Sequence, residues 1–161
     1  MASLQPITQS FYLQPPVAFE QRQYRKGSIM AYLYDTNALW AHVAQIAKLD
    51  ELLDCPTFGG TVFMPSKEYS RLYYPYLQQH LDRETARNML SASILSEVVP
   101  KCVLAQQEYV PTLNKYHDIH VTRDNPEIIV DGDKTIIIGD LVFDNGVVHV
   151  INGLIAPIVK I

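Results

Sequence analysis

The stretch NGVVHVINGLIAP, residues 145–157, holds one histidine inside an otherwise apolar run. Its first two residues, Asn-Gly, are typical of a tight turn, and VVHVI (147–151) is typical of a buried strand. Successive side chains of a strand point to opposite faces, so His149 faces away from Val148 and Val150. The stretch therefore predicts a strand that carries one titratable group among apolar neighbours.

A second strand is predicted upstream, in FGGTVFMPSKEYSRL, residues 58–72. Gly59-Gly60 favours a turn, and the four residues 61–64 form a short apolar run typical of a buried strand. Pro65 ends that run, because proline cannot donate a hydrogen bond to a neighbouring strand. Ser66 follows at a position where its hydroxyl can cap a helix. The stretch therefore predicts a strand followed directly by a helix.

Helices are predicted on both sides of this strand. Apolar residues at helical spacing indicate a helix over residues 36–53, with His42 at the rim of its apolar stripe. A further helical region is predicted over residues 81–100, with Asp82 as its cap. The tyrosines around Pro75 predict a loop between the helix that Ser66 begins and the helical region at 81–100, because proline disrupts a helix interior.

The last third of the chain is predicted to be mostly strands, because the apolar period there becomes two. Turn residues lie between apolar runs in VDGDK (130–134) and at 144–146. Helices first and strands after indicate an α+β fold with a mainly antiparallel sheet. We expect strands near residues 103–110, 117–123, 126–131, 134–143, 146–151 and 154–159.

Residues 1–34 are predicted to form an extended N-terminal arm, and residues 35–161 the globular domain. Glutamine and proline are frequent in the arm, and Pro15-Pro16 favours an extended backbone. The arm is also rich in aromatic residues, unlike a solvated tail. We therefore expect it to dock on a surface, either of its own domain or of a neighbouring protein. The arm residues expected to bind a partner are Phe11, Tyr12, Phe19, Arg22, Tyr24 and Arg25.

The composition is that of an ordinary globular domain: 161 residues, 48% hydrophobic and 19% charged. The net charge of −4 gives no reason to expect nucleic acid as the partner. Residues 1–34 hold three cations and one acid, so a basic arm (+2) precedes an acidic body (−6). Two free, buried thiols are expected at Cys55 and Cys102, although the sequence leaves a disulfide open.

Targeting signals are not evident in the sequence. The first twenty residues have no continuous apolar core of a secretory signal, and no apolar run approaches the length that spans a bilayer. We therefore expect no membrane span and a location in the cytoplasm or within a virus particle, with an extracellular location as the alternative.

Candidate catalytic and metal sites are weak throughout. His117 and His120 are three positions apart on a predicted strand, so their side chains face opposite sides and cannot share one metal. Asp131 and Asp133 bracket Gly132 but lack the remaining ligands of a calcium loop, and a hairpin turn explains them. The chain has no GxSxG, HExxH or phosphate-binding glycine loop. We therefore expect no enzyme activity, no cofactor and no metal.

Three segments together resemble the fasciclin-like domain family, the module of cell-adhesion and matrix proteins. GGTVFMPSKEYSRL (59–72) resembles the first conserved box of the family, and ILSEVVP (94–100) its central segment. NGVVHVINGLIAP (145–157) resembles the second box almost letter for letter. The resemblance covers residues 35–161 and implies a wedge of two β-sheets, mainly antiparallel, with N-terminal helices packed around it.

The resemblance also implies structural roles for the residues of the two boxes. It implies that His149 belongs to the fold rather than to a catalytic site, since both ring nitrogens of a buried imidazole can bond nearby groups. The Tyr-His pair that the family links to adhesion falls here on Ser96 and Glu97, so integrin-type adhesion does not carry over directly. The residues given a structural role are Thr61, Phe63, Pro65, Asn145, Gly146 and His149.

Three function hypotheses follow from these observations. The first is a non-enzymatic protein–protein interaction module, a structural component of a larger assembly such as a minor capsid or cement protein of a virus particle. Its partners would be other proteins, held by the arm and by exposed surface of the domain. The alternative is a secreted or cell-surface adhesion domain. The third is an enzyme or small-ligand protein that uses His149 with neighbouring Asp or Glu residues, and the absence of a catalytic pattern in the sequence argues against it.

Overall fold

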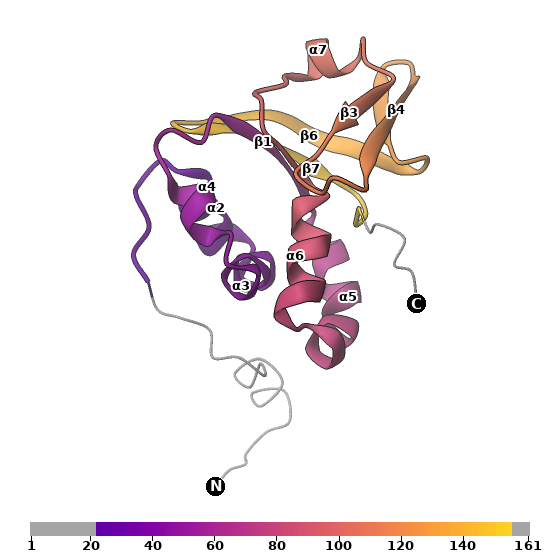
Figure 1. Ribbon diagram of the computed structural model, residues 1–161. Coiled ribbons are helices and arrows are strands. Elements are labelled where there is room, and N and C mark those ends of the chain that lie inside the picture. The colour runs from indigo at the N-terminus through magenta and orange to yellow at the C-terminus, as the bar shows by residue number, and fades with distance from the viewer. Residues whose placement is uncertain (1–21, 156–161) are drawn as a thin grey trace, which may run out of the picture.

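The computed structural model describes residues 22–155, and the structural statements below concern these residues. Figure 1 shows helices α2 to α6 on one side of strands β1, β6 and β7, with α7 on the other side. The helices are α2 (Ile29–Thr36), α3 (Ala38–Ala47), α4 (Asp50–Asp54), α5 (Lys67–His80), α6 (Arg83–Ser91) and α7 (Lys101–Leu104). The strands are β1 (Gly60–Pro65), β2 (Ile94–Leu95), β3 (Tyr109–Pro111), β4 (Asp118–Asp124), β5 (Glu127–Val130), β6 (Lys134–Phe143) and β7 (Gly146–Ile151).

The strands form one sheet in the order β2-β1-β7-β6-β5-β4-β3. The two family boxes lie side by side, because β1 pairs with β7 in parallel, residue for residue from Gly60↔Gly146 to Pro65↔Ile151. All other neighbours pair antiparallel. The resemblance implied two sheets, whereas here β6 joins both halves. Its first residues pair with β5, and the rest pairs with β7 across two irregularities that bend the strand.

Two hydrophobic cores lie on opposite faces of β1 and β7, which explains why these strands are buried at every position. Val62, Met64, Val148 and Val150 face the core made with helices α2, α3, α4 and α6. The alternate residues Phe63 and Ile151 face a second core made with β3, β4 and β5. The period-two pattern of the sequence thus separates the two cores.

Side-chain caps begin most of the longer helices, as the sequence predicts for Ser66 and Asp82. The Ser66 hydroxyl accepts from Tyr69 N at the start of α5, and Asp82 accepts from Thr85 N at the start of α6. Asn37 caps α3 and also donates to Pro65 O at the end of β1. Its amide therefore ties the first helices to the end of the strand.

The expected boundary of the arm at residue 34 does not coincide with the observed elements. Residues 29–36 form helix α2, capped by Ser28, and Ile29, Met30 and Leu33 are fully buried. The extended conformation expected through residue 34 is therefore limited, among the described residues, to the segment before Gly27. Ser28 followed by an apolar run is a typical helix start. The prediction of an extended arm relied on the aromatic and basic residues and did not take this signal into account.

Three predictions for the helical half are wrong. The loop around Pro75 is part of helix α5, which continues through the proline. The helix expected over 36–53 is two helices, because Lys48 adopts a left-handed conformation (φ 61°) between α3 and α4. His42, expected at a rim, is 6% exposed, because α2, α5 and α6 surround α3.

The prediction of a strand at 103–110 is mostly wrong. The four strands predicted between residues 117 and 151 are confirmed, with ends that agree within two residues. Pro100 fixes a backbone angle that suits the start of a helix, and 101–104 form the short helix α7. Within that range only Tyr109 and Val110 belong to a strand, β3, which ends at Pro111. For the strand expected at 154–159, Leu154 and Ile155 lie outside any strand, and the remainder lies beyond the described residues.

Candidate functional site

The imidazole of His149 is fully buried and bonded on both sides. Its Nδ1 accepts from the backbone N–H of Asp140 at 3.1 Å, on the neighbouring strand β6. Its Nε2 lies 2.8 Å from the carbonyl oxygen of Val99, so Nε2 carries the proton and donates it. The ring is therefore held neutral in one tautomer, and it connects β7 to β6 and to the segment before α7.

Burial lowers the pKa of His149 and of His42, because the charged imidazolium loses its hydration inside the protein. For His149 the hydrogen-bond pattern agrees, since Nδ1 has to remain unprotonated to accept from Asp140 N–H. His149 thus lacks the open access of a general acid, and its one ring proton is already donated to Val99 O.

Stability is expected to fall as the pH drops below about 6.5, the ordinary histidine pKa. Below this pH His149 and His42 bind protons in the unfolded chain but not in the folded one, where burial lowers their pKa. Protonation therefore lowers the free energy of the unfolded state relative to the folded state. Urea unfolding at pH 7.5 and pH 5.5 measures the difference. The His149→Gln variant should show a shallower pH dependence than the original chain between these values. An identical slope in the variant would show that His149 does not contribute.

Thr61 holds the other side of the segment that contacts His149. Its hydroxyl donates to Glu97 O at 2.7 Å and accepts from Val99 N at 2.8 Å. Phe63, two residues along β1, pairs with His149 in the strand register and contacts its ring with centroids 5.5 Å apart. Thr61 and His149 therefore fix the backbone of residues 97–99 from two strands of the sheet.

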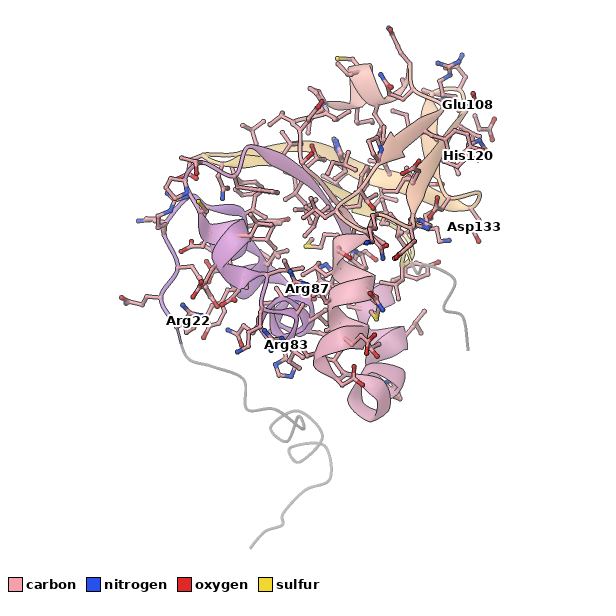
Figure 2. All side chains as sticks on the ribbon, in the orientation of Figure 1. Arg22, Arg83, Arg87, Glu108, His120 and Asp133 are labelled. Carbon is pink, nitrogen blue, oxygen red and sulfur yellow. The ribbon has the colours of Figure 1, made fainter. Side chains whose placement is uncertain are left out.

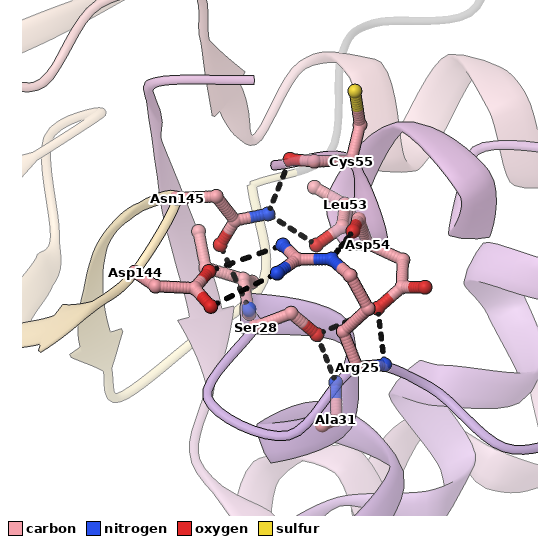
Figure 3. A network of polar contacts seen from close by, with 9 residues as sticks. Arg25, Ser28, Ala31, Leu53, Asp54, Cys55, Asp144 and Asn145 are labelled. Carbon is pink, nitrogen blue, oxygen red and sulfur yellow. Dashed lines mark hydrogen bonds and ion pairs between the residues drawn. The ribbon is translucent and has the colours of Figure 1, made fainter. Parts of the chain in front are cut away.

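Asn145 connects three parts of the chain through its buried amide (Figure 3). Oδ1 accepts from Ile29 N at 3.0 Å, at the start of α2. Nδ2 donates to Leu53 O at 2.8 Å and to Cys55 O at 3.0 Å, at the end of α4. The turn between β6 and β7 is thereby locked to both helices, which explains why an asparagine precedes the glycine of the second box.

Gly146 brings β1 and β7 close together at their first residues. A Cβ added at Gly146 would lie 2.2 Å from the carbonyl oxygen of Gly60, and its φ of 154° disfavours other residues. The two backbones thus pack where no side chain fits.

Gly146→Ala is expected to destabilise the protein by about 3 kcal/mol, since the backbone of Gly60 would have to move. Gly132→Ala is the matched control: φ is also positive (89°), but nothing lies within 4 Å of the added Cβ. We expect that control to cost only about 1 kcal/mol, by chemical denaturation. Equal losses in the two variants would mean that the close approach at Gly60 does not matter.

The described arm residues Arg22, Tyr24 and Arg25 contact their own domain. Arg25 forms a two-pronged pair with Asp144 at 3.0 and 3.1 Å and donates to Asp54 O at 2.7 Å. Arg22 pairs with Asp50 at 2.6 Å. The Tyr24 hydroxyl donates to the same carboxylate at 2.9 Å, and burial raises the pKa of Tyr24 to about 12. A neighbouring protein is therefore not needed to hold these three residues.

The three aromatic arm residues Phe11, Tyr12 and Phe19 lie outside the described residues. Arg22, at the start of the described chain, lies at the helical end of the molecule, remote from Glu108 and Asp133 at the β3–β5 end (Figure 2). The arm thus joins the domain at the helices.

Two exposed apolar side chains, Val142 and Val98, lie on or beside the face of the sheet that Thr61 faces, although Thr61 itself is buried. Thr61, Val147 and Val142 form one row across β1, β7 and β6. Val142 is 75% exposed, and Val98, in the segment that Thr61 holds, is 47% exposed. Two strand spacings separate Thr61 from Val142, roughly 10 Å. Ser96 and Glu97 are exposed beside Val98, so this side of the domain offers both apolar and polar groups.

The two histidines near β4 have different partners. His117 pairs with Asp131 at 2.8 Å, while His120 stacks on Tyr109 with ring centroids 4.8 Å apart. No group of three metal-ligating side chains occurs in residues 22–155. Asp131, Gly132 and Asp133 form the turn between β5 and β6, as the sequence predicts. Cys55 and Cys102 are free thiols, as predicted, but the expectation that they are buried is wrong, because Cys55 is half-buried and Cys102 is exposed.

Sequence reasoning missed the ion pair between Arg25 and Asp144, because it joins residues 119 positions apart. The sequence shows the basic cluster and predicts the turn that contains Asp144, but no local pattern links the two segments. The role of Asp140 was also missed. Its positive φ (59°) and its bonds to Lys101 N and His149 come from an irregularity in β6 that alternation does not predict.

The geometry of the two boxes agrees with a comparison against family models, in which the Fasciclin domain model matches residues 37–157. The chain belongs to the Fasciclin domain family. Members of this family are typically adhesion or protein-interaction modules. A comparison with curated proteins gives no match.

Among solved structures, this fasciclin-domain chain is similar to a FAS1 domain pair from the insect cell adhesion molecule Fasciclin I. The TM-score is 0.51 at 18% identity, over 81% of this chain and 46% of that one, so the likeness concerns the fold. The chain spans about half the length of that domain pair. None of the helices within residues 22–155 combines the length and the apolar character needed to cross a membrane.

Proposed function

We propose that this fasciclin-domain protein is a non-enzymatic protein–protein interaction module that serves as a structural component of a larger assembly. The observation that carries the proposal is the use of the polar groups in the two boxes. Internal hydrogen bonds occupy the polar atoms of the Thr61, Asn145 and His149 side chains. They stabilise the fold and leave the surface around them to meet other molecules.

The surface proposed to bind a partner protein is the one marked by Val98 and Val142. Exposed apolar side chains beside polar groups are typical of protein-binding sites. The backbone under Val98 is fixed by Thr61 and His149, so it is preorganised and loses little entropy on binding. The fold-building residues thus act indirectly, by holding the binding surface in shape.

An adhesion role at the cell surface is the second candidate. It rests on the family and on the printed description of the similar domain pair as part of a cell adhesion molecule. The exposed Ser96 and Glu97 stand where the resemblance places the adhesion-linked pair, so any adhesion would use other groups. We keep the first proposal at the level of an assembly component, because neither comparison points to a virus particle.

The test is quantitative capture of proteins from the natural source on the full chain and on the double variant Val98→Ser, Val142→Ser. Leu72→Ser is the matched control, because Leu72 is 71% exposed on α5, at the helical side. A specific partner should be retained by the original chain and the control and lost at least several-fold on the double variant. If the double variant retains every protein that the original chain does, this surface is not the binding site.

A further inference from the structure

A solvent-open groove of about 620 Å³ runs along α2, on the side of the domain where the arm joins it. Its walls come from residues 22–35 and from Phe143, the last residue of β6. Four aromatic side chains line it in two contacting pairs. Tyr32 and Phe143 have ring centroids 4.7 Å apart, and Tyr24 and Tyr34 meet edge to face at 5.5 Å.

The walls of this groove are fixed before any ligand binds. The Tyr24 hydroxyl donates to Asp50 and accepts from Gln45 at 3.0 Å. Helix α2 is anchored by Asn145 at Ile29 N, and Gly27 O accepts from Asp144 N at 2.9 Å. A ligand would therefore find rings already in place, which lowers the entropic cost of binding.

The chemistry of the groove favours an extended apolar peptide. Grooves lined by aromatic rings bind proline-containing segments, because such segments are already extended and present apolar ridges to the rings. Lys26 and Asp35, two charged residues at the groove, are exposed. The guanidinium of Arg22 lies over the Tyr24 ring, 5.5 Å from its centroid, so apolar groups would meet chiefly the rings of Tyr32 and Phe143. The volume falls in the usual range for small binding sites and accommodates only a short stretch of chain.

A segment with this chemistry precedes the groove in the same chain. Residues 11–19 read FYLQPPVAF, with adjacent prolines between aromatic residues and no charge. The chain reaches the described structure at Arg22, which itself lines the groove. The link is thus only a few residues long, which gives the segment a high effective concentration at this site.

We propose that the groove is a peptide-binding site and that its occupant is residues 11–19 of the same chain. This inference is separate from the surface of Val98 and Val142 and stands or falls independently of it. A second copy of the chain carries the same segment, but it lacks the short link and would need a high protein concentration to compete.

The test uses the full chain with the photoreactive amino acid p-benzoylphenylalanine in place of exposed Asp35, which lines the groove. An equimolar mixture of ¹⁴N- and ¹⁵N-labelled chains is irradiated, and cross-linked peptides are identified by mass spectrometry. If the proposal is right, position 35 cross-links to residues 11–19 of the same molecule, so both cross-linked peptides carry the same nitrogen isotope. The same amino acid at Tyr116, 86% exposed at the strand end, should not capture this segment.

The variant Pro15→Gly, Pro16→Gly in the photoreactive chain should reduce the cross-link about fivefold, because glycine loosens the extended segment. Pro6→Gly, outside the segment, is the control and should leave the yield unchanged. Mixed-isotope pairs would assign the groove to a second copy and overturn the proposal. Equal capture at Asp35 and Tyr116, or no capture of residues 11–19, would overturn it as well.

Discussion

His149→Ala is expected to lower the free energy of unfolding by about 4 kcal/mol, one of the two largest effects among the changes considered. The ring is fully buried, so its removal leaves a cavity between β7, β6 and the segment before α7. It also leaves two backbone groups without their partner, the carbonyl of Val99 and the N–H of Asp140. Chemical denaturation monitored by circular dichroism measures the loss.

Two further variants separate the causes of this loss. His149→Leu fills most of the space but restores neither hydrogen bond, so it should lose about 2 kcal/mol. His120→Ala is the control histidine, on β4, three strands away from β7 in the same sheet. Its ring is only half-buried against Tyr109, and the loss should stay below about 1 kcal/mol. If the His149→Ala variant were as stable as the original chain, the ring would not contribute to stability, and a chemical role for His149 would have to be considered again.

The sequence could predict β1 and β7, because both are short apolar runs bounded by turn residues and proline. It could also predict the alternation that separates the two cores, since a period of two fixes which side chains share a face. It could not predict how β6 joins the two halves of the sheet. Two irregularities in β6 decide this, and they depend on packing across the sheet rather than on the order of residues in one strand.

Predictions in the helical half failed where tertiary contacts outweighed local preference. Proline disfavours a helix interior by about 3 kcal/mol, yet α5 continues through Pro75 between β1 and α3. His42 was expected at a rim because histidine is polar, yet it is buried where α3 is enclosed by other helices. In both cases the surroundings of the helix, absent from any local pattern, decided the outcome.

The contacts of the candidate functional residues in the arm also could not be predicted from local sequence. Arg22, Tyr24 and Arg25 stand out in the sequence as a basic and aromatic cluster, which suggested binding to a partner. No local sequence pattern singles out their partners Asp50, Asp54 and Asp144, of which Asp50 is buried. The sequence singles these residues out, but only the folded chain shows the contacts that they make with their own domain.

Asn145→Asp is expected to destabilise the protein by about 4 kcal/mol at neutral pH. The aspartate keeps the oxygen that accepts from Ile29 N, so the contact to α2 survives. It replaces Nδ2, which donates to Leu53 O and Cys55 O, by a charged oxygen that faces two carbonyl oxygens. Two hydrogen bonds thus become two repulsive contacts inside the protein, and the start of β7 loses its tie to α4.

The loss in Asn145→Asp should shrink as the pH falls, which distinguishes it from a simple packing defect. The carbonyl oxygens and the burial raise the pKa of the new carboxyl in the folded state, so the folded state binds a proton more readily than the unfolded state. Relative to the original chain, the variant therefore gains stability at low pH, where a protonated carboxyl can donate to one carbonyl. Asn152→Asp is the matched control, since Asn152 accepts from Thr135 N through an oxygen that aspartate keeps. Urea unfolding of both variants at pH 7.5 and pH 5 tests this, and a loss at Asn145 that is independent of pH would show that its Nδ2 does not make the bonds described.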